Sequence, residues 1–159
     1  MINPTDNKTG VYFHIPFCKR ACHYCNFHFS TSLQSKSDMV NALIREIDIT
    51  RGKRIRLITT VYFGGGTPSI LLRKELRTLM EAVRKYFQII PDAEFTFEVN
   101  PDDMNDMSVP FWRQQGMNRL SIGIQSFRNE DLQWMNRAHT SEQAFNGLEL
   151  ARKEGLANY

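Results

Sequence analysis

The feature that most constrains the fold is a repeated change of hydrophobic period, from strand-like runs to helix-like stripes. Residues 57–63 form a nearly continuous apolar and threonine-rich run that stops at three glycines, Gly64 to Gly66. Such a run is typical of a strand in a parallel sheet that is buried on both faces. A helix is predicted directly after it, with Thr67 as its N-cap and Pro68 at its first position. Its predicted buried stripe consists of Leu72, Leu76, Leu79, Met80, Val83 and Phe87.

The same order of strand and helix recurs on both sides of this unit. Residues 10–15, 94–99 and 119–124 are rich in β-branched and aromatic side chains and predict three further strands, the first of them ended by Pro16. A helix capped by Ser37 or Asp38 is predicted to end near Gly52, because its apolar residues recur at spacings of three and four. An irregular helical stretch broken by Pro110 precedes the last strand.

The final helix has clear signals at both ends. Thr140 and Gln143 form a capping box, and Gly155 is suited to the C-terminal cap. Residues 156–159 resemble the start of another strand. Four βα units predict an α/β fold with parallel strands, whose functional loops leave the carboxyl ends of the strands. Four units cannot close a barrel, so we expect residues 1–159 to be the N-terminal portion of a partial (βα) barrel, with the rest absent.

Composition restricts the class of protein without naming a partner. The 159 residues are 42% hydrophobic, and the net charge of +3 comes from 20 basic and 17 acidic residues that are well mixed. This balance gives no reason to expect a nucleic-acid partner. The polar first ten residues lack the apolar core of a signal peptide, and no apolar run is long enough to span a bilayer. We therefore expect a cytoplasmic protein.

All three cysteines of the chain lie within eight residues, at Cys18, Cys22 and Cys25. An odd, tightly spaced set suits metal ligation in a reducing compartment better than a disulfide framework. Three thiolates on one loop can each bind a different iron of a [4Fe–4S] cluster and leave the fourth iron open for a ligand. The alternative is a Cys3His zinc site that uses His14, His23 or His28, because the cysteine spacing also suits zinc.

Polar residues at the predicted strand ends form a second set of candidates. The turn Gly65-Gly66-Thr67 would let the backbone approach a ligand closely, although a plain tight turn or a phosphate-binding loop would have the same residues. Glu98 and Gln125 end the next two strands, and Arg137 follows them. Taken singly, each of these polar residues has an ordinary alternative as part of a solvated loop or a helix cap.

The cysteine segment, Cys18-Lys-Arg-Ala-Cys22-His-Tyr24-Cys25, resembles the C-x3-C-x-aromatic-C signature of the radical S-adenosylmethionine enzymes. With the glycine turn and the strand-end residues, the resemblance narrows to the oxygen-independent coproporphyrinogen III oxidases and the related haem chaperones. It covers roughly residues 10–139. It implies a three-quarter barrel, a [4Fe–4S] cluster and S-adenosylmethionine bound to the open iron. Cleavage of that cofactor gives a 5′-deoxyadenosyl radical in the family.

The resemblance also implies which residues contact the cofactors. It places Cys18, Cys22 and Cys25 on the cluster. It places the following residues on S-adenosylmethionine: Tyr12, Tyr24, Gly65, Gly66, Thr67, Glu98, Gln125 and Arg137. Glu98 suits an amine or a ribose hydroxyl, and Arg137 suits a carboxylate, because such hydrogen bonds are charge-assisted.

One departure from the family pattern concerns the subgroup. The oxidases carry a further cysteine two residues after the third, and this chain has Phe27 there. The resemblance therefore favours a haem chaperone without oxidase activity, with a true coproporphyrinogen III dehydrogenase as the alternative. The implied partners are haem or a porphyrinogen, an electron donor such as a flavodoxin or ferredoxin, and membrane respiratory proteins as haem acceptors. Family contacts to substrate lie largely beyond residue 159.

Overall fold

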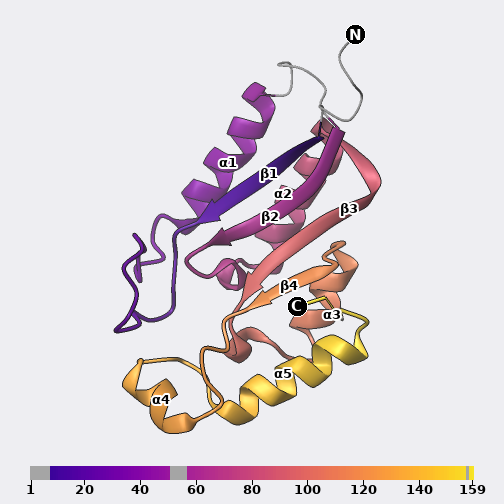
Figure 1. The fold of residues 1–159 in the computed structure, drawn as a ribbon. Coiled ribbons are helices and arrows are strands. Elements are labelled where there is room, and N and C mark those ends of the chain that lie inside the picture. The colour runs from indigo at the N-terminus through magenta and orange to yellow at the C-terminus, as the bar shows by residue number, and fades with distance from the viewer. Residues whose placement is uncertain (1–7, 51–56, 157) are drawn as a thin grey trace.

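A computed structural model describes residues 8–50, 57–156 and 158–159 (Figure 1). In these ranges, four parallel strands form one sheet in the order β1 (Lys8–Ile15), β2 (Leu57–Gly65), β3 (Gln88–Val99) and β4 (Arg119–Ile122). The helices are α1 (Lys36–Thr50), α2 (Arg73–Tyr86), α3 (Ser108–Gln114), α4 (Asn129–Trp134) and α5 (Ser141–Lys153). Short 3₁₀ turns, η2 (Pro68–Ile70) and η3 (Pro101–Asp103), follow β2 and β3. The predicted α/β class with parallel strands is confirmed.

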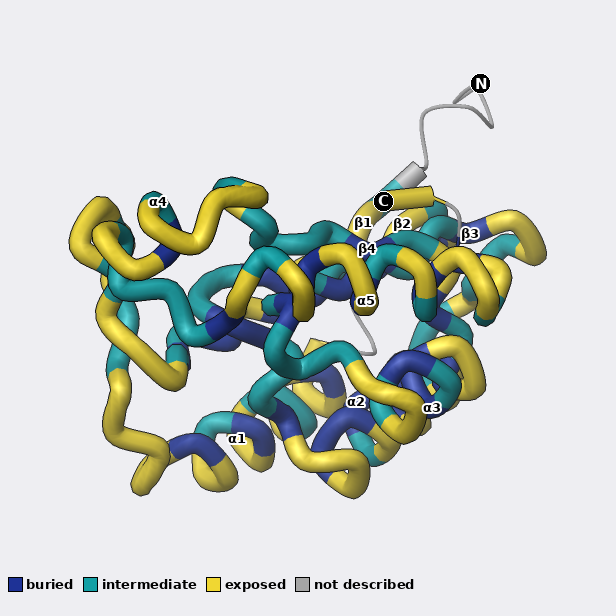
Figure 2. Tube along the Cα trace, turned by 90° about the horizontal axis from the view of Figure 1, so that it is seen from below, coloured by how far each residue is buried: buried dark blue, intermediate teal, exposed yellow. Residues whose placement is uncertain are grey.

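The strand register divides the sheet into an apolar face and a polar face. Phe13 pairs with Phe63, Phe63 with Phe97, and Phe97 with Leu120, so these side chains form one buried row. The Phe13 and Phe63 rings stack at 4.6 Å between centroids. Helices α1, α2 and α3 lie along this side of the sheet and complete the core (Figure 2). The site must therefore form at the strand ends or on the opposite face.

The prediction that residues 57–63 are buried on both faces is wrong. Val61 and Phe63 are buried on the helix side, whereas Thr60 is exposed and Tyr62 is half-buried on the other side. Glu98 also lies on that side, because strand side chains alternate and its neighbours Phe97 and Val99 are buried. The second face thus carries polar and aromatic side chains that reach the cavity described below.

The helix after the glycine turn begins later than predicted. Thr67 precedes the 3₁₀ turn η2 and makes no side-chain capping bond, and α2 begins at Arg73 with Leu72 as its N-cap residue. The Glu75 carboxylate accepts a hydrogen bond from the Leu72 N–H at 2.8 Å and stabilises this start. Leu72 is consequently 61% exposed, and Leu71 packs in its place.

Other helix limits differ from the predictions in smaller ways. Helix α1 begins at Lys36 rather than after a Ser37 or Asp38 cap, and the predicted end near Gly52 lies outside the described residues. Pro110 does not break α3. It occupies the first turn of that helix, where its missing N–H has no partner to lose.

The predicted ends of the last helix are confirmed. The Thr140 hydroxyl accepts the Gln143 N–H, and the Gln143 side chain accepts the Thr140 N–H. Gly155 has φ +74°, and the Leu156 N–H donates to the Ala151 carbonyl, as in a Schellman motif. Helix α4 was not predicted.

Strand β4 is shorter than predicted, because the chain leaves the ladder after Ile122. Beside it, the Leu120 N–H donates to the Asn158 carbonyl at 3.0 Å, although the described residues after α5 form no assigned strand. No helix within the described ranges is both long and apolar enough to cross a bilayer.

Candidate functional site

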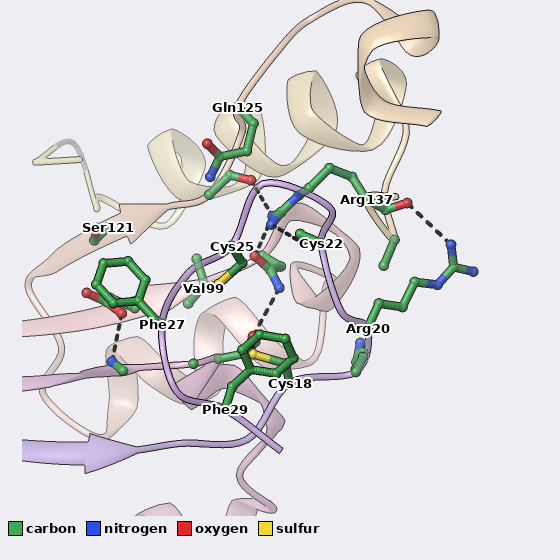
Figure 3. Close-up of a pocket in the computed structure, with 18 of the residues that line it drawn as sticks. Cys18, Arg20, Cys22, Cys25, Phe27, Phe29, Val99, Ser121, Gln125 and Arg137 are labelled. Atoms are coloured by element: carbon green, nitrogen blue, oxygen red, sulfur yellow. Dashed lines mark hydrogen bonds between the residues drawn. The ribbon is translucent and has the colours of Figure 1, made fainter. Parts of the chain in front are cut away.

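A cavity of about 310 Å³ lies at the carboxyl ends of the strands, between the cysteine loop and the segments that follow β3 and β4 (Figure 3). The sequence-predicted residues that line it are Cys18, Cys22, Tyr24, Cys25, Gly65, Gly66, Thr67, Glu98, Gln125 and Arg137. These residues come from five separate stretches of the chain, at 18–25, 65–67, 98, 125 and 137. The parallel sheet brings them together because all of its strands end at the same edge.

Tyr12 is the predicted site residue that does not line this cavity. Its ring is 56% exposed and lies 5.7 Å from the Tyr62 ring, centroid to centroid. Its hydroxyl lies 3.3 Å from His14 Nδ1. The structure thus places Tyr12 beside the site, on the polar face of the sheet.

The cysteine loop is closed at its base by backbone hydrogen bonds. The Cys18 N–H donates to the Ser30 carbonyl at 3.0 Å, and the Ser30 N–H donates to the Pro16 carbonyl at 2.8 Å. Within the loop, the Cys25 N–H donates to the Cys22 carbonyl at 3.1 Å, which makes a tight turn. The three cysteines are free thiols, all half-buried, and all three contact the cavity.

The far side of the loop docks on the chain that follows α4. The His23 N–H donates to the Met135 carbonyl at 3.1 Å, and His23 Nδ1 donates to the Trp134 carbonyl at 2.7 Å. The Asn136 side-chain amide donates to the Ala21 carbonyl at 2.9 Å. His23 is therefore engaged in holding the loop in this structure.

The glycine turn lies against the first cysteine. A Cβ atom added at Gly66 would approach the Phe17 carbonyl oxygen to 2.7 Å and Cys18 Sγ to 2.8 Å. Gly65 has φ +119°, a backbone conformation that side chains rarely permit. The Thr67 hydroxyl donates to Cys18 Sγ at 3.4 Å. Glycine at 66 is therefore required for the cysteine loop to lie this close.

Two hydrogen-bond donors of the protein itself hold the Glu98 carboxylate in place. The Tyr62 hydroxyl donates to Glu98 Oε1 at 2.6 Å, and the Gly65 N–H donates to Oε2 at 3.1 Å. Each carboxylate oxygen can still accept another hydrogen bond. Burial, and then the neighbouring Glu98 charge, raise the pKa of Tyr62 above its usual value, so this phenol is a proton donor at neutral pH.

Arg137 links the cysteine loop to the ends of β3 and β4. One terminal nitrogen donates to Cys22 Sγ at 3.4 Å and to the Tyr24 hydroxyl at 3.2 Å. The other donates to Asn100 Oδ1 at 2.6 Å and to the Gly123 carbonyl at 2.7 Å. Its Nε is buried and has no partner in the described residues. The guanidinium thus leaves one donor unmatched.

The three cysteines line the cavity as free thiols. Across the described ranges, no three side chains of His, Cys, Asp or Glu are placed to ligate one metal ion, so the alternative Cys3His centre is not assembled. Cysteines that each bind a separate iron of a cluster border a group larger than one ion, and these three all line the cavity. Burial raises the pKa of the Cys18 thiol, and a bound iron would stabilise its thiolate.

Sequence reasoning missed several residues of this site, and three of them have polar side chains near Glu98 or Arg137. Tyr62 positions Glu98, Asn100 binds Arg137 and also donates to the Thr67 hydroxyl at 3.4 Å, and Ser121 lines the cavity opposite Glu98. Asn100 directly follows the predicted strand 94–99, which was the available signal, whereas Ser121 lies inside the predicted strand 119–124. Nothing in the sequence alone distinguishes Tyr62, because its role depends on the register between β2 and β3.

Comparison with known proteins agrees with this geometry. The Heme chaperone HemW of Bacillus subtilis (strain 168) is 35% identical over 152 residues, which cover 94% of this chain and 40% of the relative. The oxygen-independent coproporphyrinogen III oxidase of Bradyrhizobium diazoefficiens is 34% identical over 161 residues, which cover 97% of this chain and 35% of the relative. The solved structure of coproporphyrinogen III oxidase (HemN) from Escherichia coli, described as a radical SAM enzyme, superposes on this chain with a TM-score of 0.87. It has 33% identity and covers 94% of this chain and 35% of its own.

The chain therefore spans about 40% of the length of the curated relatives that it matches. A sequence model described as "Radical SAM superfamily" matches residues 12–158. That family in general uses a [4Fe–4S] cluster and S-adenosylmethionine. With a match over almost its whole length, this chain belongs to the radical SAM superfamily.

Proposed function

We propose that Cys18, Cys22 and Cys25 hold a [4Fe–4S] cluster in this cavity and that S-adenosylmethionine binds beside it. The observation that carries the proposal is the meeting of the three thiols with the glycine turn and two charged side chains around one cavity. We further propose that residues 1–159 form the N-terminal portion of a larger partial barrel. The match to less than half of each relative's length supports this division.

Different residues of the cavity suit different chemical groups of S-adenosylmethionine. The free lone pairs of Glu98 suit an ammonium or a ribose hydroxyl, because a carboxylate forms charge-assisted hydrogen bonds with such donors. Gly65, Gly66 and Thr67 present backbone close to the first cysteine, where a side chain would block approach. Arg137 suits a carboxylate, and its buried Nε is a hydrogen-bond donor that has no acceptor among the described residues. Tyr24 and Gln125 complete the wall.

When bound, the cluster supplies the electron that cleaves the sulfonium of S-adenosylmethionine. The protein's part is to hold the cofactor next to the cluster and to limit access of water. Phe27 and Phe29 lie on the side of the cavity formed by the cysteine loop (Figure 3). Their apolar rings suit that second task.

Within the family, we propose a haem chaperone-like protein, with coproporphyrinogen III oxidation as the second candidate. Phe27 stands where the oxidases are expected to have a further cysteine, and HemW proteins are prominent among the relatives. On this proposal the partners are haem, a flavodoxin- or ferredoxin-like electron donor and membrane respiratory proteins. The free thiols suit a cytoplasmic location.

Anaerobic reconstitution with iron and sulfide tests the proposal. The wild-type protein should take up about four irons per chain and change its electron paramagnetic resonance spectrum when S-adenosylmethionine is added. Cys22→Ser should lose the cluster, because assembly depends on all ligands. Ser35→Ala, an exposed position outside the cavity, is the matched control and should keep its iron. Iron-free wild-type protein, or zinc at one ion per chain, would reject the proposal.

A second measurement separates the two candidate activities. Haem binding without decarboxylation of coproporphyrinogen III is the result expected for a chaperone. Decarboxylation by the reconstituted protein would instead establish the oxidase. Phe27→Cys should not confer that activity, because the contacts that recognise a porphyrinogen are not supplied by this one position.

A further inference from the structure

Gln125 occupies an unfavourable backbone conformation at the edge of the cavity. Its φ is +63°, in the left-handed region, although it is not a glycine. The Ser126 N–H donates to the Ile124 carbonyl at 2.7 Å, which closes a three-residue turn around Gln125. Such conformations cost free energy and persist only where neighbouring groups enforce them. Something in the structure must therefore hold this turn.

Two side chains from one short segment form hydrogen bonds with the carbonyls of Gly123 and Ile124, at the start of the turn. Arg137 donates to the Gly123 carbonyl at 2.7 Å, and His139 Nε2 lies 3.0 Å from the Ile124 carbonyl. A carbonyl can only accept, so Nε2 must carry the proton and donate. His139 is 3% exposed, and burial lowers its pKa below the usual value, which favours the neutral ring. His139 is thus a fixed donor to the turn.

The conformation of this turn also determines where the Gln125 side-chain amide lies. A Cβ atom built on Gly123 would stand 3.5 Å from Gln125 Nε2 and 3.0 Å from Arg137, so the amide lies beside the guanidinium. Gln125 lines the cavity, and Figure 3 shows it above the cysteines, near Arg137. A different backbone conformation at Gln125 would move this amide, because φ sets the direction of the side chain.

We propose that His139 is a positioning residue that holds the Ile124–Ser126 turn and thereby directs the Gln125 amide toward a ligand of the cavity. His139 itself does not line the cavity. The identity of the ligand as S-adenosylmethionine rests on the proposed function above, whereas the clamp on the turn does not.

Hydrogen–deuterium exchange of the cofactor-free protein tests the clamp alone. His139→Gln keeps a donor near the place of Nε2, whereas His139→Asn is also an amide but is too short to reach the Ile124 carbonyl. The peptide that contains Ser126 should exchange faster in His139→Asn than in His139→Gln. Equal exchange in the two variants would overturn the proposal. In wild-type protein, nitrogen NMR should show a neutral His139 with its proton on Nε2, and a proton on Nδ1 instead would overturn it without any variant.

Cofactor affinity tests the link from the clamp to the ligand. In anaerobically reconstituted protein, His139→Asn should weaken S-adenosylmethionine binding about tenfold with unchanged iron content, and His139→Gln should recover most of the loss. In a Gln125→Ala background, His139→Asn should cause no further loss. An equal loss in both backgrounds would show that His139 does not act through Gln125. Wild-type protein that binds a cluster but not S-adenosylmethionine would reject the proposed function, and the exchange result would still decide the clamp.

Discussion

Single residues in this site are constrained by what their backbones touch, and Gly66 is the clearest case. A methyl group at this position would press on Cys18 Sγ and on the Phe17 carbonyl, and that backbone group cannot move without displacing the start of the cysteine loop. We expect Gly66→Ala to lose most of its iron after reconstitution and about 1–3 kcal/mol of stability. Gly155→Ala is the control, because its new Cβ meets nothing within 4 Å but suffers a φ of +74°. It should lose stability and keep its iron, as measured by iron assay and thermal unfolding.

Tyr62 is the residue on which the orientation of Glu98 depends. Tyr62→Phe removes the hydroxyl that donates to Glu98 Oε1 at 2.6 Å and leaves the ring in place. S-adenosylmethionine affinity should fall about tenfold while iron content is unchanged, as titration of the reconstituted protein would measure. Tyr12→Phe is the comparison, because the Tyr12 hydroxyl is paired with His14. A larger loss in Tyr12→Phe would show that the wrong tyrosine has been assigned this role.

At the scale of residues, the chemistry of single side chains was enough to locate the site, but the contacts between its residues were not predicted. Cys18, Gly66 and Glu98 were predictable because thiols, a bare backbone and a strand-end carboxylate each suit a ligand. Tyr62 and Asn100 were not, since each acts by contacting a residue more than thirty positions away. The first contact follows from strand register and the second from the path of the chain after α4, and a single sequence fixes neither.

Among the elements, helices α1 and α2 are joined by a buried ion pair. Lys36 Nζ lies 2.5 Å from Glu75 Oε2, and both side chains are about nine-tenths buried. Burial alone would raise the pKa of Glu75, but hydrogen bonds from Lys36, the Leu72 N–H and Ser37 outweigh it and hold the pKa below its usual value. The carboxylate is therefore stabilised in the folded state.

This pair predicts a pH dependence of stability. A depressed folded-state pKa stabilises the protein at pH values above the unfolded-state pKa, and this contribution disappears as the pH falls through the lower folded-state pKa. Glu75→Gln should cost about 3 kcal/mol at neutral pH, because it leaves the Lys36 ammonium buried without its charge partner. In urea unfolding, the difference in stability from wild type should shrink as the pH falls below the ordinary pKa of a glutamate. Glu81→Gln, on an exposed part of α2, is the control. A gap that does not change with pH would contradict this account.

The existence and order of the elements were better predicted than their ends. Thr67 and Pro68 are a good signal for a helix start, yet Thr67 binds Cys18 instead and the helix begins at Arg73. Gln125 was expected at the end of a strand, but β4 stops at Ile122 where the turn held by His139 begins. In both places a contact at the site prevails over local propensity.

At the scale of the whole molecule, the alternation of strands and helices was enough to predict the parallel sheet. It was not enough to predict its polar face, because the threonines and tyrosine of β2 were compatible with burial on both sides. Nor did it predict that the cysteine loop after β1 would dock on the segment after α4. That docking joins parts of the chain 115 residues apart and holds the cysteine loop against the end of α4.

Asn136 allows this docking to be tested apart from general stability. It has φ +58° and donates to the Ala21 carbonyl at 2.9 Å, so it has both a backbone role and a side-chain role. Asn136→Gly removes the hydrogen bond but accepts the left-handed conformation, whereas Asn136→Ala loses the bond and is strained. The free energy of unfolding of the glycine variant should lie within about 0.5 kcal/mol of the wild-type value, and that of the alanine variant should be about 1 kcal/mol lower than that of the glycine variant.

The two variants should nevertheless release iron to a chelator at the same increased rate, because both free the loop between Cys18 and Cys22. This rate is followed by the loss of cluster absorbance in the reconstituted protein. If only the alanine variant released iron faster, the cluster would respond to strain in the segment after α4. If neither did, the base of the loop, closed by Pro16 and Ser30, would suffice to hold the three cysteines around the cavity.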